Sequence, residues 1–141
     1  MKVFVDTNVL IDYVCKREPF FVPAKGVIAT CLLEKHEIVV SSLTIVNTLY
    51  IGRKYGIEVL KNKLSELSKM LTVADLFADI VLDMLKSDWF DYEDALQYAT
   101  AMQNGANCIV TRNKKDFAKS QIPVYTPDEF LESIVVKDES H

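Results

Sequence analysis

The chain has 141 residues, 50% of them hydrophobic and 26% charged, with only 4 glycines and 4 prolines. We therefore expect a single folded domain over residues 1–141, because this composition excludes collagen, repeat arrays and intrinsic disorder. The net charge of −4 excludes nucleic-acid binding through bulk positive charge alone. The longest nearly apolar run, 26–33, is too short to cross a bilayer, and the N-terminus lacks a secretory signal, so we expect a cytoplasmic protein without a membrane partner.

The first half of the chain predicts strands that alternate with helices. A β-branched and aromatic run, 2–6, ends at a carboxylate and leads directly into an apolar helical pattern. Pro19 and Pro23 then break the chain before a helix over 24–35, which is followed by a strand over 37–41. Two amphipathic helices follow, over 43–55 and 57–70, with Gly56 between them.

The second half continues the alternation. We expect a short strand over 71–73, a helix over 75–86, and a helix over 91–104 that ends at Gly105. Strands over 108–111 and 123–125 and a final helix from Pro127 complete the chain. This order predicts an α/β fold with a mainly parallel sheet and helices on both faces.

Polar residues gather where the expected strands end. In an open parallel sheet, ligands bind beyond the carboxyl ends of the strands, so these positions are the first to inspect. The start of the helix at 91–104 adds further carboxylates, and an amide lies about one turn into the helix at 43–55. The candidates are Asp6, Thr7, Asn8, Asn47, Glu93, Asp94, Thr111, Arg112, Asn113 and Asp116.

Carboxylates from these segments would share one cleft if the segments converge. Crowded carboxylates repel one another unless a cation neutralises them, and oxygen ligands without His or Cys partners favour Mg²⁺ or Mn²⁺. Each carboxylate also has a structural explanation: Asp6 as a helix N-cap, Asp94 as the capping partner of Asp91, and Asp116 as a turn residue. Glu93 lies about 100° round the helix from Asp94, so we expect it to support the site or remain solvated.

Four segments carry a family resemblance: 3–12 (VFVDTNVLID), 41–44 (SSLT), 91–97 (DYEDALQ) and 109–117 (IVTRNKKDF). Taken in this order, they resemble the PIN-domain family of ribonucleases, which includes the toxins of VapBC-type toxin–antitoxin pairs. The resemblance extends over nearly the whole chain, and the first and last segments are the most diagnostic. It implies a three-layer α/β/α sandwich and metal-dependent hydrolysis of RNA phosphodiester bonds.

The resemblance also implies a site and partners. The catalytic, metal-binding carboxylates would be Asp6, Asp94 and Asp116, holding Mg²⁺ or Mn²⁺. The partners would be an RNA substrate, a small antitoxin and a second copy of the chain in a homodimer. Residues that orient the ligands or contact RNA would be Thr7, Asn8, Asn47, Glu93, Thr111, Arg112 and Asn113.

A run of cations lies beside the proposed site, formed by Arg112, Lys114, Lys115 and Lys119. Such a run can guide an anionic strand toward an otherwise acidic protein. It can equally be a solvated loop.

One position departs from the family pattern. The family usually places a glutamate on the helix after the second strand, where this chain has Asn47. An amide can coordinate a metal or hold a bound water, but it removes one negative charge, so we expect weaker metal binding. The alternative function is a non-catalytic PIN-like module that binds RNA or protein.

Overall fold

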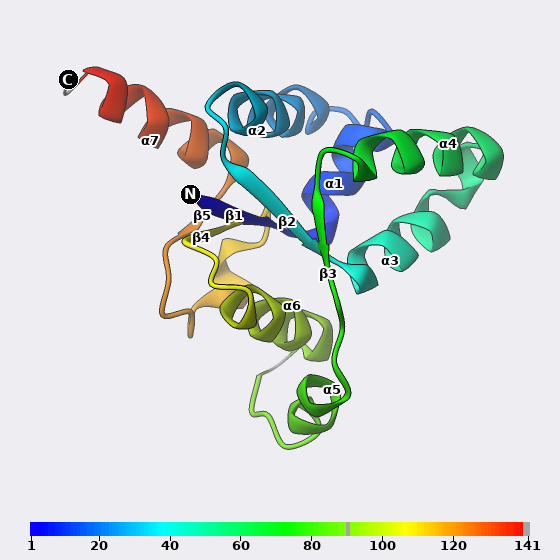
Figure 1. The fold of residues 1–141 in the computed structure, drawn as a ribbon, viewed down its shortest axis with the longest axis vertical. Helices are drawn as coiled ribbons and strands as arrows, with labels where there is room; N and C mark the ends of the chain where they lie inside the picture. The colour runs from blue at the N-terminus through cyan, green and yellow to red at the C-terminus, as the bar shows by residue number, and fades with distance from the viewer. Residues whose placement is uncertain (90, 140–141) are drawn as a thin grey trace.

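A computed structural model describes residues 1–89 and 91–139, which form an α/β fold around a five-stranded sheet (Figure 1). The strands are β1 (Lys2–Val5), β2 (Glu37–Ser41), β3 (Thr72–Ala74), β4 (Cys108–Val110) and β5 (Val124–Tyr125). Their order is β3-β2-β1-β4-β5, and each described pair of neighbours is parallel. The predicted parallel sheet is thus confirmed.

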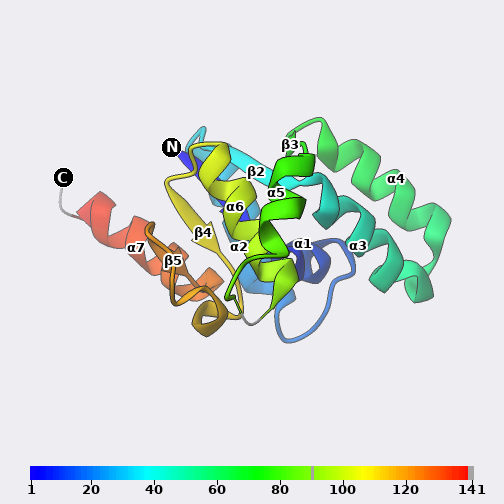
Figure 2. The same cartoon turned by 90° about the horizontal axis from the view of Figure 1, so that it is seen from below.

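Helices cover both faces of the sheet. Figure 1 shows α5 and α6 on one side and α1, α2 and α4 on the other, while Figure 2 shows α3 and α4 extending to one end and α7 to the opposite end. The helices are α1 (Thr7–Val14), α2 (Phe21–Leu33), α3 (Ser42–Gly52), α4 (Ile57–Ser68), α5 (Ala78–Met84), α6 (Tyr92–Gln103) and α7 (Pro127–Glu139), with 3₁₀ turns η1 (Arg53–Tyr55) and η2 (Lys114–Phe117).

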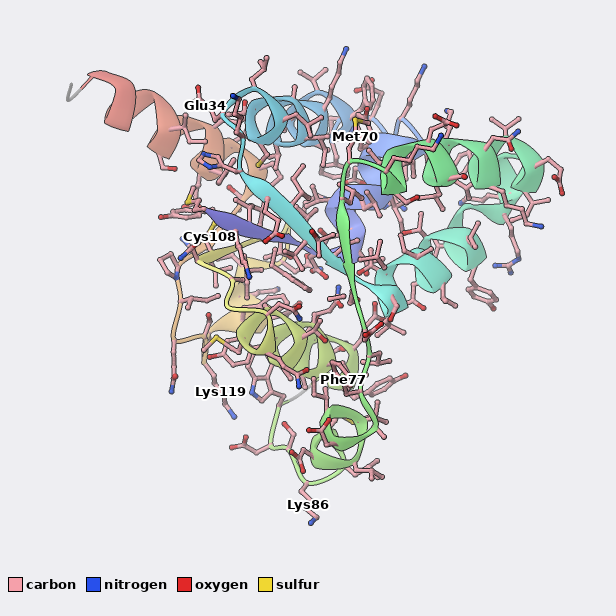
Figure 3. All side chains as sticks on the ribbon, in the orientation of Figure 1. Glu34, Met70, Phe77, Lys86, Cys108 and Lys119 are labelled. Carbon is pink, nitrogen blue, oxygen red and sulfur yellow. The ribbon has the colours of Figure 1, made fainter. Side chains whose placement is uncertain are left out.

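Alternation along the buried strands builds a core on each side of the sheet. In β1, Val3 and Val5 pack into the core beneath α1, α2 and α4, whereas Phe4 packs into the core beneath α6. Both faces of the strand are therefore apolar, which explains its continuous hydrophobic run. Side chains fill the spaces on both sides of the sheet (Figure 3), as a three-layer sandwich requires.

Several predicted boundaries differ from the structure. Helix α2 begins at Phe21, so Pro23 lies inside its first turn, where the missing N–H has no helical partner to lose. Helix α5 is shorter than the predicted 75–86, and β3 extends to Ala74. Gly105 lies just beyond α6 with φ of +68°, as a helix-ending glycine should.

Within residues 1–89 and 91–139, no helix combines the length and apolarity that a membrane span requires. Cys31 and Cys108 are buried, and Cys15 is half-buried.

Candidate active site

The site lies where the strand order reverses. β1 pairs with β2 on one side and with β4 on the other. In open parallel sheets, ligands bind outside the carboxyl ends of the strands at such a switch point, and we call this region the crevice. Asp6 follows β1 and Thr111 follows β4, and the backbone N–H of Asp6 donates to the carbonyl of Val110 at 3.0 Å. The two segments predicted to converge therefore meet at this crevice.

Asp6 is 5% exposed and is held by neutral donors. Its Oδ1 accepts the backbone N–H of Thr7 at 2.8 Å, which makes it the N-cap of α1, and also accepts Nε2 of Gln97 at 3.0 Å. Its Oδ2 accepts the hydroxyl of Thr111 at 2.8 Å and, at 3.4 Å, Nδ2 of Asn8. Burial raises the pKa of Asp6, and these hydrogen bonds oppose the rise. Within the described part of the chain, no lysine or arginine forms a salt bridge with Asp6.

Gln97 belongs to the site although the sequence did not single it out. Its side chain is fully buried on α6, and Nε2 also lies within hydrogen-bond distance of Thr7 Oγ1 at 3.2 Å and Thr44 Oγ1 at 2.8 Å, so its two hydrogens serve three acceptors. Its Oε1 accepts the hydroxyl of Ser41 at 2.5 Å. A signal for Gln97 was present, because a residue three positions after Asp94 lies on the same face of a helix.

Asp94 is half-buried at the start of α6, and the charges of the other carboxylates act on it. Burial is the largest cause that raises its pKa, and together with the charges of Asp6, Asp91, Asp116 and Glu93 it brings the pKa to about 7. Asp91 is the N-cap, accepting the backbone N–H groups of Glu93 and Asp94 at 2.8 and 3.1 Å. The capping role and the carboxylate cluster therefore coexist at this helix start.

Glu93 and Asn47 contact each other across the crevice. Asn47 Nδ2 on α3 donates to Glu93 Oε1 on α6 at 2.9 Å. Burial raises the pKa of Glu93, with Asp6 and Asp91 adding to the rise and the Asn47 bond opposing it. Asn47 thus faces the acidic cluster, where it contributes a donor in place of a charge.

Asp116 and Asn113 lie on the loop after β4. Asp116 is an exposed residue of η2, and its charge acts on both Asp6 and Asp94. The Asn113 side chain is exposed, while its backbone N–H donates to Thr111 Oγ1 at 3.1 Å. Asp6, Asp94 and Asp116 therefore share one electrostatic cluster.

The chemistry of the donor set fits a divalent cation. The carboxylates offer hard oxygens, and the pKa values of Asp6 and Asp94 are raised first by burial and then by the charges of neighbouring carboxylates. A bound cation would offset both effects. In the residues that the structure describes, no three acidic, His or Cys side chains already stand close enough to share one ion. The candidate ligands Asp6, Asp94 and Asp116 therefore need side-chain adjustment before they could share one.

The cations beside the site are mostly used in ion pairs. Arg112 Nε lies 2.6 Å from Asp12 Oδ2, and its guanidinium lies 3.9 Å from the ring centre of Phe20. Lys114 pairs with Glu129 at 3.0 Å, and Lys119 with Asp88 at 2.9 Å. Less positive charge is therefore available to an anionic strand than the run of cations predicts. Arg112 also supports the site through its backbone N–H, which donates to the side chain of Asn8 at 3.2 Å.

The sequence profile of the PIN domain matches residues 2–115, which include the segments carrying Asp6, Asn47 and Asp94. The chain belongs to the PIN-domain family. The profile match stops one residue before Asp116. The predicted family and the predicted α/β/α fold are thus both confirmed.

Individual relatives match the PIN-domain chain over almost its full length. Ribonuclease VapC1 of Aquifex aeolicus (strain VF5) is 28% identical over 139 residues, covering 93% of this chain and 94% of that protein. A toxin–antitoxin complex from Klebsiella pneumoniae contains a chain that is 26% identical with a TM-score of 0.63, covering 89% of this chain and 97% of the other. VapBC2 from Rickettsia felis, bound to a promoter DNA fragment, has a TM-score of 0.64 at 19% identity with the same coverage, which shows a shared fold.

Proposed function

We propose that this PIN-domain chain is a metal-dependent endoribonuclease and the toxin of a toxin–antitoxin pair. The observation that carries the proposal is Asp6, a buried carboxylate at the switch point whose hydrogen-bond donors are all neutral. Asp94 and Asp116 add negative charge beside it. The name of the Aquifex relative, a ribonuclease, supports RNA as the substrate class.

The residues of the proposed site have three roles: holding the metal, positioning its ligands and contacting RNA. Asp6, Asp94 and Asp116 would hold a Mg²⁺ or Mn²⁺ ion, which when bound supplies the positive charge that polarises the scissile phosphate and activates water. Thr111 fixes one oxygen of Asp6, and Asn8 joins that pair to the loop after β4. The exposed Asn113 and Lys115 lie on that loop, where a phosphate backbone could contact them.

The partner proposal is a small antitoxin, supported by the toxin–antitoxin complexes among the structural neighbours. A groove of about 560 Å³ lies between α1, α2 and α4, and its lining includes none of Asp6, Asp94 and Asp116. It is lined by apolar side chains, including Phe21 and Leu67, by three lysines, Lys16, Lys25 and Lys63, and by one carboxylate, Glu66. This surface suits a segment that is both apolar and acidic. A homodimer also remains part of the proposal, to be tested by light scattering after size exclusion.

Cleavage of a 5′-labelled RNA by the purified chain tests the nuclease proposal. We expect cleavage with Mn²⁺ or Mg²⁺, none with EDTA, and none with Asp6→Asn, whose fold is checked by circular dichroism. Intact RNA under all conditions, with Mn²⁺ bound or not, contradicts the nuclease proposal. RNA binding without cleavage would favour the non-catalytic module.

Expression in cells tests the toxin proposal separately. We expect induction of the wild-type chain to arrest growth and induction of Asp6→Asn to leave growth normal. A short neighbouring reading frame whose product relieves the arrest would identify the antitoxin. If the wild-type chain cleaves RNA in vitro but cells that express it as strongly as Asp6→Asn grow normally, the toxin proposal is contradicted and the nuclease proposal is not.

A further inference from the structure

We propose that Gln97 is a positioning residue that fixes the Asp6 carboxylate so that its Oδ2 is the oxygen presented to a cation. The inference rests on the proposed metal-dependent function and adds a residue to it. It is carried by the hydrogen-bond geometry around two buried side chains, Gln97 on α6 and Asp6 at the end of β1.

The orientation of the Gln97 amide is determined by its neighbours. Nε2 faces the carboxylate of Asp6, which accepts only, so the amino group must lie on that side. On the opposite side, Oε1 accepts the hydroxyl of Ser41 at 2.5 Å. Both ends of the amide are thus hydrogen-bonded inside the protein, which favours this one orientation of the side chain.

The two oxygens of Asp6 are bonded unequally. Oδ1 accepts the Thr7 backbone at 2.8 Å and Gln97 at 3.0 Å, which use both of its lone pairs. Oδ2 accepts one short bond from Thr111 at 2.8 Å, while the Asn8 contact is long at 3.4 Å. Oδ2 thus keeps the capacity to accept a further partner, and Gln97 is the side chain that occupies the competing oxygen.

The same network joins three elements of the fold. Thr44, at the start of α3, lies within hydrogen-bond distance of Thr7, Ser41 and Gln97, at 2.8, 3.1 and 2.8 Å. Gln97 therefore connects β1–α1 to α3 and α6 at the crevice. In the hydrogen-bond network of the described residues, Thr44 is not bonded to Asp6 itself, and this provides a matched control.

The experiment compares Gln97→Met with Thr44→Val in the full chain. Methionine keeps the length of the side chain but removes the donor to Asp6, whereas valine keeps the shape of threonine and removes bonds of the same network one residue further away. Calorimetry with Mn²⁺ gives the dissociation constant, thermal unfolding in EDTA gives the stability, and RNA cleavage gives kcat and KM.

We expect Gln97→Met to bind Mn²⁺ about 10 to 100 times more weakly, the usual effect of losing an outer partner of a metal ligand. Its kcat should fall while KM for RNA stays near the wild-type value. Thr44→Val should keep its Mn²⁺ affinity within about threefold of the wild-type value. We expect this even if Thr44→Val lowers the unfolding temperature as much as Gln97→Met does. Equal losses of affinity in the two variants, or wild-type affinity in Gln97→Met, would overturn the positioning role.

Ser41→Ala keeps the test decisive if Gln97→Met does not fold. It leaves Gln97 in place and removes the hydroxyl that orients its amide, so we expect affinity to fall about tenfold, beyond the range of the Thr44→Val control. Affinity within about threefold of the wild type would overturn the inference. Wild-type chain that binds Mn²⁺ but cuts no RNA overturns the proposed function alone, whereas wild-type chain that binds no Mn²⁺ overturns both.

Discussion

Two buried aspartates at opposite ends of α1 have partners of different charge. Asp12, 1% exposed, has Arg112 Nε at 2.6 Å and Arg17 Nε at 3.2 Å. Asp6, 5% exposed, has hydroxyl, amide and backbone donors, and no charged donor among the residues that the structure describes. Burial raises the pKa of both carboxyls, but only Asp12 has guanidinium charges that oppose the rise.

The contrast separates a structural carboxylate from one that is available to a ligand. Hydrogen bonds from neutral groups stabilise an ionised carboxylate without cancelling its charge, whereas arginines cancel it. The charge of Asp12 is therefore balanced by Arg17 and Arg112, and the ion pair with Arg112 connects the end of α1 to the loop after β4. The Asp6 cluster keeps a net negative charge that a divalent cation can neutralise.

The largest expected effect is the loss of cleavage in Asp6→Asn. The amide keeps the shape of the side chain and most of its hydrogen bonds, so we expect the unfolding free energy to change by less than about 1 kcal/mol. Metal-dependent cleavage should fall at least 100-fold, about 2.7 kcal/mol of barrier, because the buried anionic ligand is gone. Single-turnover assays with saturating RNA measure the rate. A rate within tenfold of the wild type would show that Asp6 is no more functional than Asp12.

The opposite result is expected from Asp12→Asn. Removing this charge leaves Arg112 and Arg17 without their anion, and we expect a loss of about 2 kcal/mol in unfolding free energy, less than for a fully enclosed pair because both arginines are partly solvated. Urea denaturation measures it. Cleavage per folded molecule should stay within about tenfold of the wild type. An unchanged unfolding free energy would mean that the ion pairs of Asp12 with Arg17 and Arg112 do not stabilise the fold.

The positions of Asp6 and Thr111 at the ends of strands could be predicted from the sequence. The hydrogen-bond and ion-pair partners of Asp6 and Asp12 could not. The apolar run that stops at Asp6, and the matching run before Thr111, predict that both residues lie at one edge of a parallel sheet. The donor from Gln97 and the pairing of Asp12 with Arg112 depend on which helix faces pack together, and Arg112 lies 100 residues from Asp12. Single-sequence patterns carry no information on such distant pairs.

Helix boundaries show the same limit. The predicted helix over 75–86 forms only over Ala78–Met84, because its ends depend on packing against α6 rather than on local preference. Asp91, in contrast, caps α6 as its residue type and position predict. Capping is a local interaction, which explains why it can be predicted when packing cannot.

Asp94→Asn should stabilise the metal-free protein. Its folded pKa of about 7 lies above the ordinary value of 3.8, so this group favours folding most below about pH 4, and that contribution is lost as the pH rises toward 7. The variant should therefore gain about 1 kcal/mol at pH 8 in EDTA, a value reduced for solvent screening of a half-buried group, and nothing at pH 4.

Unfolding curves for Asp94→Asn and the wild type at pH 4 and pH 8 measure this difference. Saturating Mn²⁺ should reverse the order at pH 8, because only the wild type keeps the full set of ligands. Asp12→Asn serves as the control and should be less stable than the wild type at pH 8 with or without Mn²⁺. A pH-independent gain for Asp94→Asn would mean that the cluster repulsion is not its source.

The smallest expected effect concerns Asn47, the one position where the crevice has an amide in place of the usual family acid. Asn47→Glu replaces the donor to Glu93 with a second carboxylate, so the metal-free protein should lose about 1 kcal/mol at pH 8. The added charge should strengthen Mn²⁺ binding a fewfold, measured by calorimetry. Asn47→Gln, which keeps an amide, controls for size. If both variants bind Mn²⁺ with the same affinity, a charge at position 47 does not affect the cation. The group of acidic residues around Asp6 that influences Mn²⁺ binding would then not include position 47.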